Sequence, residues 1–202
     1  MKRTSTQTRR VLAMARTAKV FRLKELTSRG IHPEEIRRLW RKGLLVRSSR
    51  GVYHLPNAEF SGNLSLAEVA KRVPRGVICL LTALRFHGVG TQMPPEVWLA
   101  LHRRAARPRL DRPRLRVVRF SGQAFTEGVE QHTADHVSVR VYSIAKTVAD
   151  CFKYRNKIGL DVALEALREA LKRRKITMDE IWKYARICRV ARVMQPYLEA
   201  IA

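Results

Sequence analysis

Along the first 58 residues, apolar positions recur with the period of amphipathic helices and then with that of short strands. Ile36, Leu39 and Trp40 are spaced to share one helix face, and we expect that face to enter a hydrophobic core. Pro33 stands at the first helical position, where a missing N–H does no harm, and Gly43 ends the helix. The pattern predicts helices over residues 6–17, 23–29 and 33–43 and a hairpin over residues 44–55.

Three helices followed by a hairpin is the element order of a winged helix-turn-helix. We therefore predict such a domain over residues 1–58, a linker over residues 56–61, and a second domain over residues 59–202.

The second domain changes from helix to strand and back to helix along the chain. Ser65 and Glu68 have the spacing of a capping box, and residues 77–87 have the apolar content of a buried helix. Strands are predicted over residues 97–101, 115–120 and 137–142. Helices are predicted over residues 143–153 and 161–174, and a further helix begins at Thr177, whose capping-box partner is Glu180. The fold class is therefore α+β: an N-terminal winged helix-turn-helix followed by a mixed α/β C-terminal domain with a small sheet and a helical C-terminus.

Charge changes this picture more than any other property. Lys and Arg total 41 against 17 Asp and Glu, a formal net charge of +24. A compact protein of this charge repels itself unless a polyanion neutralises it. Nucleic acid is the commonest such partner, and an anionic membrane is the alternative. No apolar run reaches the roughly 18 residues that a membrane span needs, so no membrane partner is expected.

The helix over residues 33–43 has a basic face opposite its apolar one. Four cations at spacing i, i+1, i+4 and i+5 repel one another, and phosphate or guanine acceptors would offset that repulsion. The hairpin tip adds two arginines flanking two hydroxyls, and Tyr53 either donates to a phosphate or packs as a strand aromatic. The alternative is a solvated basic face on a structural module. The residues predicted to bind double-stranded DNA are Arg37, Arg38, Arg41, Lys42, Arg47, Ser48, Ser49, Arg50 and Tyr53.

Residues 103–119 hold eight arginines and a single acid, Asp111. Pro108 and Pro113 favour an extended loop. This loop is either a second nucleic-acid surface, because phosphate attraction needs no fixed geometry, or a solvated segment. The residues of the predicted second surface are Arg103, Arg104, Arg107, Arg109, Arg112 and Arg114.

Signatures of common enzymes are missing: we find no P-loop, dinucleotide fingerprint, nucleophile elbow or zinc-protease motif, so neither an enzyme nor a cofactor is expected. His132 and His136 have a helical metal-ligand spacing, but the segment runs into a strand and only neighbouring acids could complete a site, so no metal is expected. Cys79, Cys151 and Cys188 lack CxxC spacing and lie in apolar contexts, which predicts buried thiols in a reducing compartment.

Several segments resemble the AbiEi-type antitoxins and transcriptional regulators of bacterial type IV toxin–antitoxin systems. In the predicted winged helix they are GLLVR and RGVY. In the second domain they are LTALRFHG, PPEVW, SIAKTVAD and ALEAL, so that the similarity covers nearly the whole chain. These segments are residues 43–47, 50–53, 81–88, 94–98, 143–150 and 163–167.

The resemblance implies a cytoplasmic, nucleoid-associated autorepressor that binds inverted repeats in its own promoter. It also implies that the C-terminal domain counteracts a nucleotidyltransferase-like toxin, without a stable complex between the two. Lys146, Thr147 and Asp150 are candidates for antitoxicity by resemblance, whereas spacing alone predicts a Lys146–Asp150 salt bridge on the surface of a structural helix. The alternative function is a stand-alone transcriptional regulator, or a protein- or RNA-interaction module, with no toxin partner.

Overall fold

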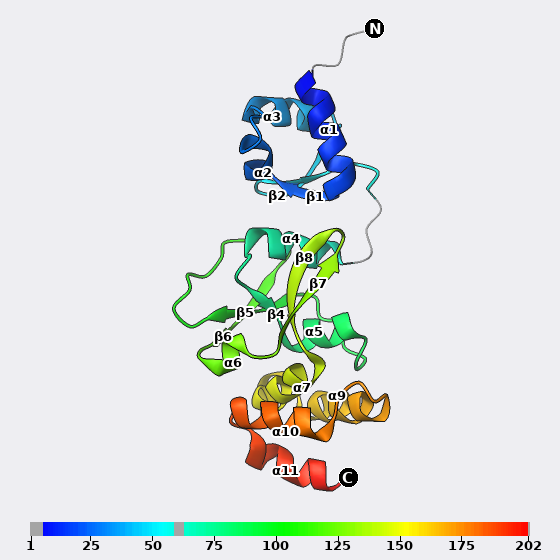
Figure 1. The fold of residues 1–202 in the computed structure, drawn as a ribbon, viewed down its shortest axis with the longest axis vertical. Coiled ribbons are helices and arrows are strands. Elements are labelled where there is room, and N and C mark those ends of the chain that lie inside the picture. Colours follow the sequence, from blue (N-terminus) through cyan, green and yellow to red (C-terminus); the bar gives the residue numbers. More distant parts are fainter. Residues whose placement is uncertain (1–5, 59–62, 202) are drawn as a thin grey trace. The chain divides into compact units, whose positions relative to one another are not determined.

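We describe residues 6–58 and 63–201 of a computed structural model (Figure 1). Helices and small sheets are mixed along the chain, so the predicted α+β class is confirmed. The chain forms two compact units. The first unit comprises residues 1–74, 108–114 and 132–139, and the second unit comprises residues 75–107, 115–131 and 140–202. The division into residues 1–58 and 59–202 stays a prediction, and residues 59–61 of the predicted linker lie outside the described residues.

The first unit begins with three helices and a three-stranded antiparallel sheet of order β1-β3-β2. Both the predicted helices and the predicted hairpin are present, with shifts of a few residues at their ends. The helices are α1 (Thr6–Ala18), α2 (Leu23–Thr27) and α3 (Pro33–Arg41), and the strands are β1 (Val20–Arg22), β2 (Val46–Ser49) and β3 (Val52–His54).

The core of this part contains one face of each helix and the inward side of the sheet. Ile36 and Leu39 are buried as predicted, but Trp40 is 41% exposed, so the prediction that it enters the core is wrong. The chain turns at Gly43, at φ +70°, and Leu45 enters the core after Leu39, whereas Trp40 packs against the Arg47 guanidinium instead. The core residues are Val11, Ala15, Phe21, Leu26, Ile31, Ile36, Leu39, Leu45 and Tyr53.

Helix α4 (Leu64–Arg72) also belongs to the first unit. Its Lys71 pairs with Glu25 of α2 at 2.8 Å. The predicted capping box is wrong, because α4 begins after Asn63 and Glu68 is buried instead of capping the helix. Burial raises the pKa of Glu68, and the nearby Ser48 hydroxyl opposes that rise in part.

A five-stranded sheet of order β6-β5-β4-β8-β7 follows. Strand β5 pairs in parallel with β6 and antiparallel with β4, and β4 pairs in parallel with β8. Three of its strands were predicted. Strand β7 was not, because its polar sequence VEQHTA shows no apolar alternation that would mark a buried face. The strands are β4 (Val77–Ile78), β5 (Val97–His102), β6 (Leu115–Phe120), β7 (Val129–Ala134) and β8 (Val137–Tyr142).

The prediction of a single buried helix over residues 77–87 is wrong for its first residues. Val77 and Ile78 form β4, and helix α5 (Leu80–His87) begins after Cys79. The β-branched pair fits between β5 and β8 in the sheet, and Leu80, at φ +48°, marks the change of direction. Both halves are buried, which is why an apolar run alone could not separate strand from helix.

Helices make up the rest of the second unit, and Figure 1 shows most of them gathered on one side of the sheet. The predicted capping box of Thr177 and Glu180 is present. Cys79, Cys151 and Cys188 are buried free thiols, as predicted. Among the described helices, none has the length and apolar character of a membrane span. The helices are α6 (Gln123–Thr126), α7 (Ile144–Lys153), α8 (Arg155–Ile158), α9 (Leu160–Lys172), α10 (Met178–Ile187) and α11 (Ala191–Glu199).

Candidate nucleic-acid interface

The outward face of α3 carries the predicted cations. Ile36 and Leu39 anchor the opposite face in the core, and His32 caps the first turn by accepting the Glu34 N–H at 3.3 Å. The helix is therefore fixed in rotation, and its basic face points to solvent. The exposed cations of this face are Arg37, Arg38, Arg41 and Lys42.

Two of these four cations are paired within the first unit. Arg37 lies 3.3 Å from the Glu34 carboxylate, and both side chains are more than half exposed. Arg38 lies 2.6 Å from Glu35 and 3.0 Å from the Thr8 hydroxyl on α1, so it also holds α3 against α1. These pairs, three residues apart on one helix, reduce the repulsion that the sequence predicts for this face.

Arg41 and Lys42 differ from their neighbours. Over residues 6–58 and 63–201, neither side chain forms an ion pair. Both follow the last buried position of α3 and are exposed. They are therefore the cations of α3 whose charge is left for a partner.

The hairpin adds cations next to the end of α3. The Arg47 guanidinium lies over the Trp40 ring, 5.4 Å from its centroid, which joins β2 to the last turn of α3. Arg50 is exposed at the turn, where Gly51 adopts φ +76°. The Arg47–Trp40 contact thus places a cation of the hairpin beside the end of α3.

Three residues of the predicted DNA-binding set face inward. Tyr53 is 5% exposed and stacks on Phe21 with ring centroids 6.2 Å apart, so it packs as a strand aromatic. Ser48 and Ser49 are half-buried, and within the described residues neither hydroxyl has a hydrogen-bond partner. The structure therefore brings together the cations of the predicted site but not its hydroxyl groups.

An exposed apolar patch lies among these cations and was missed in the sequence. It consists of Trp40, Leu44 and Val46, which are 41%, 43% and 37% exposed. Apolar side chains interleaved with arginines are typical of surfaces that contact sugars and bases. The signal that could have revealed the patch is the run RLWRK, in which cations flank Trp40 on both sides.

The arginines of the predicted second surface are all exposed. Within the described residues none of the six forms an ion pair. The structure divides them, however: residues 103–107 belong to the second unit and residues 108–114 to the first. A single surface made of all six stays a prediction.

Lys146 and Asp150 form the predicted salt bridge, with Nζ 2.5 Å from Oδ2, but both side chains are fully buried. The prediction that the pair lies on a helix surface is wrong, because α7 packs against α5, α9 and α10 and is buried over most of its length. His132 and His136 lie on β7 and in the turn after it, so a helical ligand spacing does not apply to them.

Aromatic rings and a thiol surround this buried pair. Lys146 Nζ lies 4.2 Å from the Tyr142 ring centroid and 4.7 Å from that of Phe120, and Cys188 Sγ donates to Asp150 Oδ1 at 3.2 Å. Burial raises the pKa of Asp150, and the Lys146 charge opposes that rise. Burial and the Asp150 charge raise the pKa of Cys188 to about 12. Neither charged side chain of the pair is accessible to a partner protein in this structure.

Comparison with protein families bears on the first unit. Residues 9–56 match the family model described as "Transcriptional regulator, AbiEi antitoxin". The match begins in α1 and runs through β3, so it contains α3 and the hairpin. The resemblance predicted from the sequence is confirmed for these residues. Comparison with curated protein sequences gave no match.

Comparison with solved structures gives a match to the fold. The crystal structure of the RV2827C protein from Mycobacterium tuberculosis superimposes with a TM-score of 0.62 at 18% sequence identity. The alignment covers 91% of this chain and 72% of the mycobacterial one. At this identity the likeness concerns the fold alone.

Proposed function

We propose that residues 9–56, which match the family model of AbiEi antitoxin transcriptional regulators, form a winged helix-turn-helix that binds double-stranded DNA. In this proposal α2 and α3 are the helix-turn-helix, α3 enters the major groove, and the β2–β3 hairpin is the wing. The observation that carries it is the surface formed by Arg41, Lys42 and Arg47, whose charges have no carboxylate partner within the described residues.

We further propose that the DNA is the promoter of the chain's own operon, where binding to inverted repeats represses transcription in the bacterial cytoplasm. Arg38, which bonds to Thr8 on α1, helps to hold α3 in place, and the unpaired cations contact phosphates, which position the protein without reading sequence. Residues in the first turn of α3 are those closest to base edges in such complexes.

An electrophoretic mobility shift titration tests this proposal with the full chain, its upstream DNA and random DNA of equal length at one salt concentration. We expect the upstream fragment to bind about a thousandfold more tightly. Equal affinity for both fragments would show that the surface binds DNA without an operator, and no binding to either would overturn the proposal.

Replacing Trp40 with alanine is expected to separate DNA binding from folding. Because Trp40 is 41% exposed, the free energy of unfolding should change by less than about 1 kcal/mol. Affinity for the upstream DNA should fall about tenfold, since the variant loses an aromatic contact and the support under Arg47.

Two further variants calibrate this result. Trp40→Phe keeps an aromatic ring and should retain most of the affinity. Leu39→Ala removes a buried side chain from the same helix and should lower the free energy of unfolding by about 2–5 kcal/mol. Wild-type affinity in Trp40→Ala would place the apolar patch outside the interface.

The family description also names an antitoxin, and we propose that this chain counteracts a nucleotidyltransferase-like toxin. Co-expression with the product of the neighbouring gene tests this, with growth as the readout. We expect full rescue by the wild-type chain and by Arg41→Ala/Lys42→Ala, because in this proposal the C-terminal domain, and not α3, counteracts the toxin. Absence of rescue together with intact operator binding would indicate a stand-alone regulator.

A further inference from the structure

A pocket of about 400 Å³ lies within the second unit. Its walls come from the end of β6, the loop into α6, and the C-terminal ends of α7 and α10. Four of the residues that line it are cations and none is a carboxylate. The polar residues of the pocket are Arg119, Ser121, Gln123, Lys153, Arg186 and Arg189.

These cations line one hollow, and no carboxylate lines it with them. Arg119 is fixed by donating to the carbonyls of His102 at 3.1 Å and Ala105 at 2.6 Å, which uses one of its terminal nitrogens. Lys153 Nζ lies 6.0 Å from the centroid of Phe120, a ring that also lines the pocket. In the part of the chain that the structure describes, none of the four cations forms an ion pair with a carboxylate.

Helix dipoles account for only part of this arrangement. Lys153 and Arg186 stand in the last turns of α7 and α10, where the carbonyl ends of the helices attract cations. Arg119 lies on a strand, and Arg189 lies beyond the end of α10. Helix dipoles therefore do not explain why all four cations line the same pocket.

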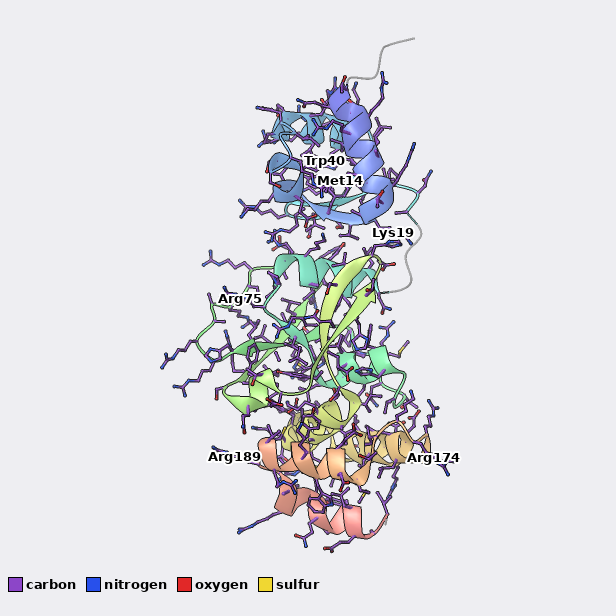
Figure 2. All side chains as sticks on the ribbon, viewed as in Figure 1. Met14, Lys19, Trp40, Arg75, Arg174 and Arg189 are labelled. Atoms are coloured by element: carbon purple, nitrogen blue, oxygen red, sulfur yellow. The ribbon has the colours of Figure 1, made fainter. Side chains whose placement is uncertain are left out.

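Arg189 occupies this position in an unfavourable backbone conformation. It follows the C-cap residue Cys188 and has φ +59°, where glycine is the usual residue and other residues are strained. Arg174 follows the C-cap of α9 in the same conformation, at φ +51°, but does not line the pocket. The conformation alone is thus no sign of a ligand, and Arg174 provides a matched control. Figure 2 shows the two arginines at different ends of the helical layer.

We propose that this pocket binds a compact, multiply charged phosphate compound, such as a nucleotide polyphosphate or free pyrophosphate. Guanidinium forks and an ammonium group suit phosphoryl oxygens, and charge-assisted hydrogen bonds are the strong ones. The volume falls in the range of small-molecule sites, roughly 300–1,000 Å³. A hollow of this size encloses a compact anion, whereas a nucleic-acid strand requires an extended groove.

Isothermal titration calorimetry of the full chain with ATP, and separately with inorganic pyrophosphate, tests this inference at physiological salt. We expect saturable binding at one site per chain. Arg186→Gln and Arg189→Gly should each weaken it about tenfold, and Arg174→Gly should leave it unchanged. ATP binding well above that of pyrophosphate would identify a nucleotide as the ligand, and equal binding would identify the phosphate groups alone.

Thermal unfolding of the variants excludes misfolding as the cause of lost binding. Arg189→Gly and Arg174→Gly both relieve the same backbone strain, so both should unfold at or above the wild-type temperature. Absence of saturable binding to either compound would overturn the inference. Equal losses in Arg174→Gly, or binding of oligonucleotides alone, would overturn it too. Because Arg41→Ala/Lys42→Ala acts in the first unit, it should not alter ATP binding, so this inference and the DNA proposal can fail separately.

Discussion

Replacing Lys146 with methionine is expected to lower the free energy of unfolding of the second unit by about 3–5 kcal/mol. The substitution leaves the Asp150 carboxylate fully buried, with the Cys188 thiol as its remaining side-chain donor among the described residues. Urea denaturation followed by circular dichroism measures the loss. An unchanged midpoint would show that the pair contributes little, even though its atoms lie 2.5 Å apart.

Two further variants test whether the unpaired Asp150 charge causes this loss of unfolding free energy. Lys146→Met/Asp150→Leu removes both charges and should regain most of the stability, since apolar residues of similar size replace buried ion pairs well. Arg37→Ala breaks a pair that is more than half exposed and should change stability by no more than about 1 kcal/mol. A double variant as unstable as the single one would mean that packing, and not charge, dominates.

The pH dependence of the Lys146→Met variant gives an independent check. Burial already raises the pKa of Asp150, and removing Lys146 takes away the charge that opposes the rise. An acid whose pKa is higher in the folded state than in the unfolded state favours folding below its unfolded pKa, and this stabilisation is lost as the pH rises through the folded pKa. The deficit of the variant relative to the wild type should therefore be smaller in mildly acidic solution than at neutral pH.

This pair also shows what the sequence could and could not predict. A spacing of four residues predicts that Lys146 and Asp150 meet, because that is a local property of one helix. Whether they meet in water depends on how many other elements cover the helix, and α7 is covered by three. Charged residues are so seldom fully buried that the surface is the natural expectation.

Trp40 is the opposite case, since an apolar residue at core spacing lies outside. Helical period assigned it to the same face as Ile36 and Leu39, but period does not tell where the core ends along the helix axis. In the structure the core continues from Leu39 to Leu45, beyond the turn at Gly43, and Trp40 is left outside it. The basic face of α3 was predictable because polar exposure needs no knowledge of packing, whereas the apolar patch beside it was not.

The second large effect is expected from Arg41→Ala/Lys42→Ala, which should weaken binding to the upstream DNA about 10–100-fold at low salt. Each cation that contacts a phosphate releases a counterion, so affinity falls with rising salt in proportion to the number of contacts. Losing two contacts should reduce the slope of log affinity against log salt by about 1.8. Fluorescence anisotropy at several salt concentrations measures both quantities.

Charge-matched variants separate this effect from the loss of net charge. Arg174→Ala/Arg192→Ala removes two exposed cations from the second unit and should leave the salt slope near the wild-type value. Arg38→Ala should lower the free energy of unfolding but change the salt slope little, because Glu35 and Thr8 already hold that guanidinium. If the Arg41→Ala/Lys42→Ala variant kept the wild-type slope, the phosphate contacts would have to come from other cations, and α3 would not be the helix that enters the groove.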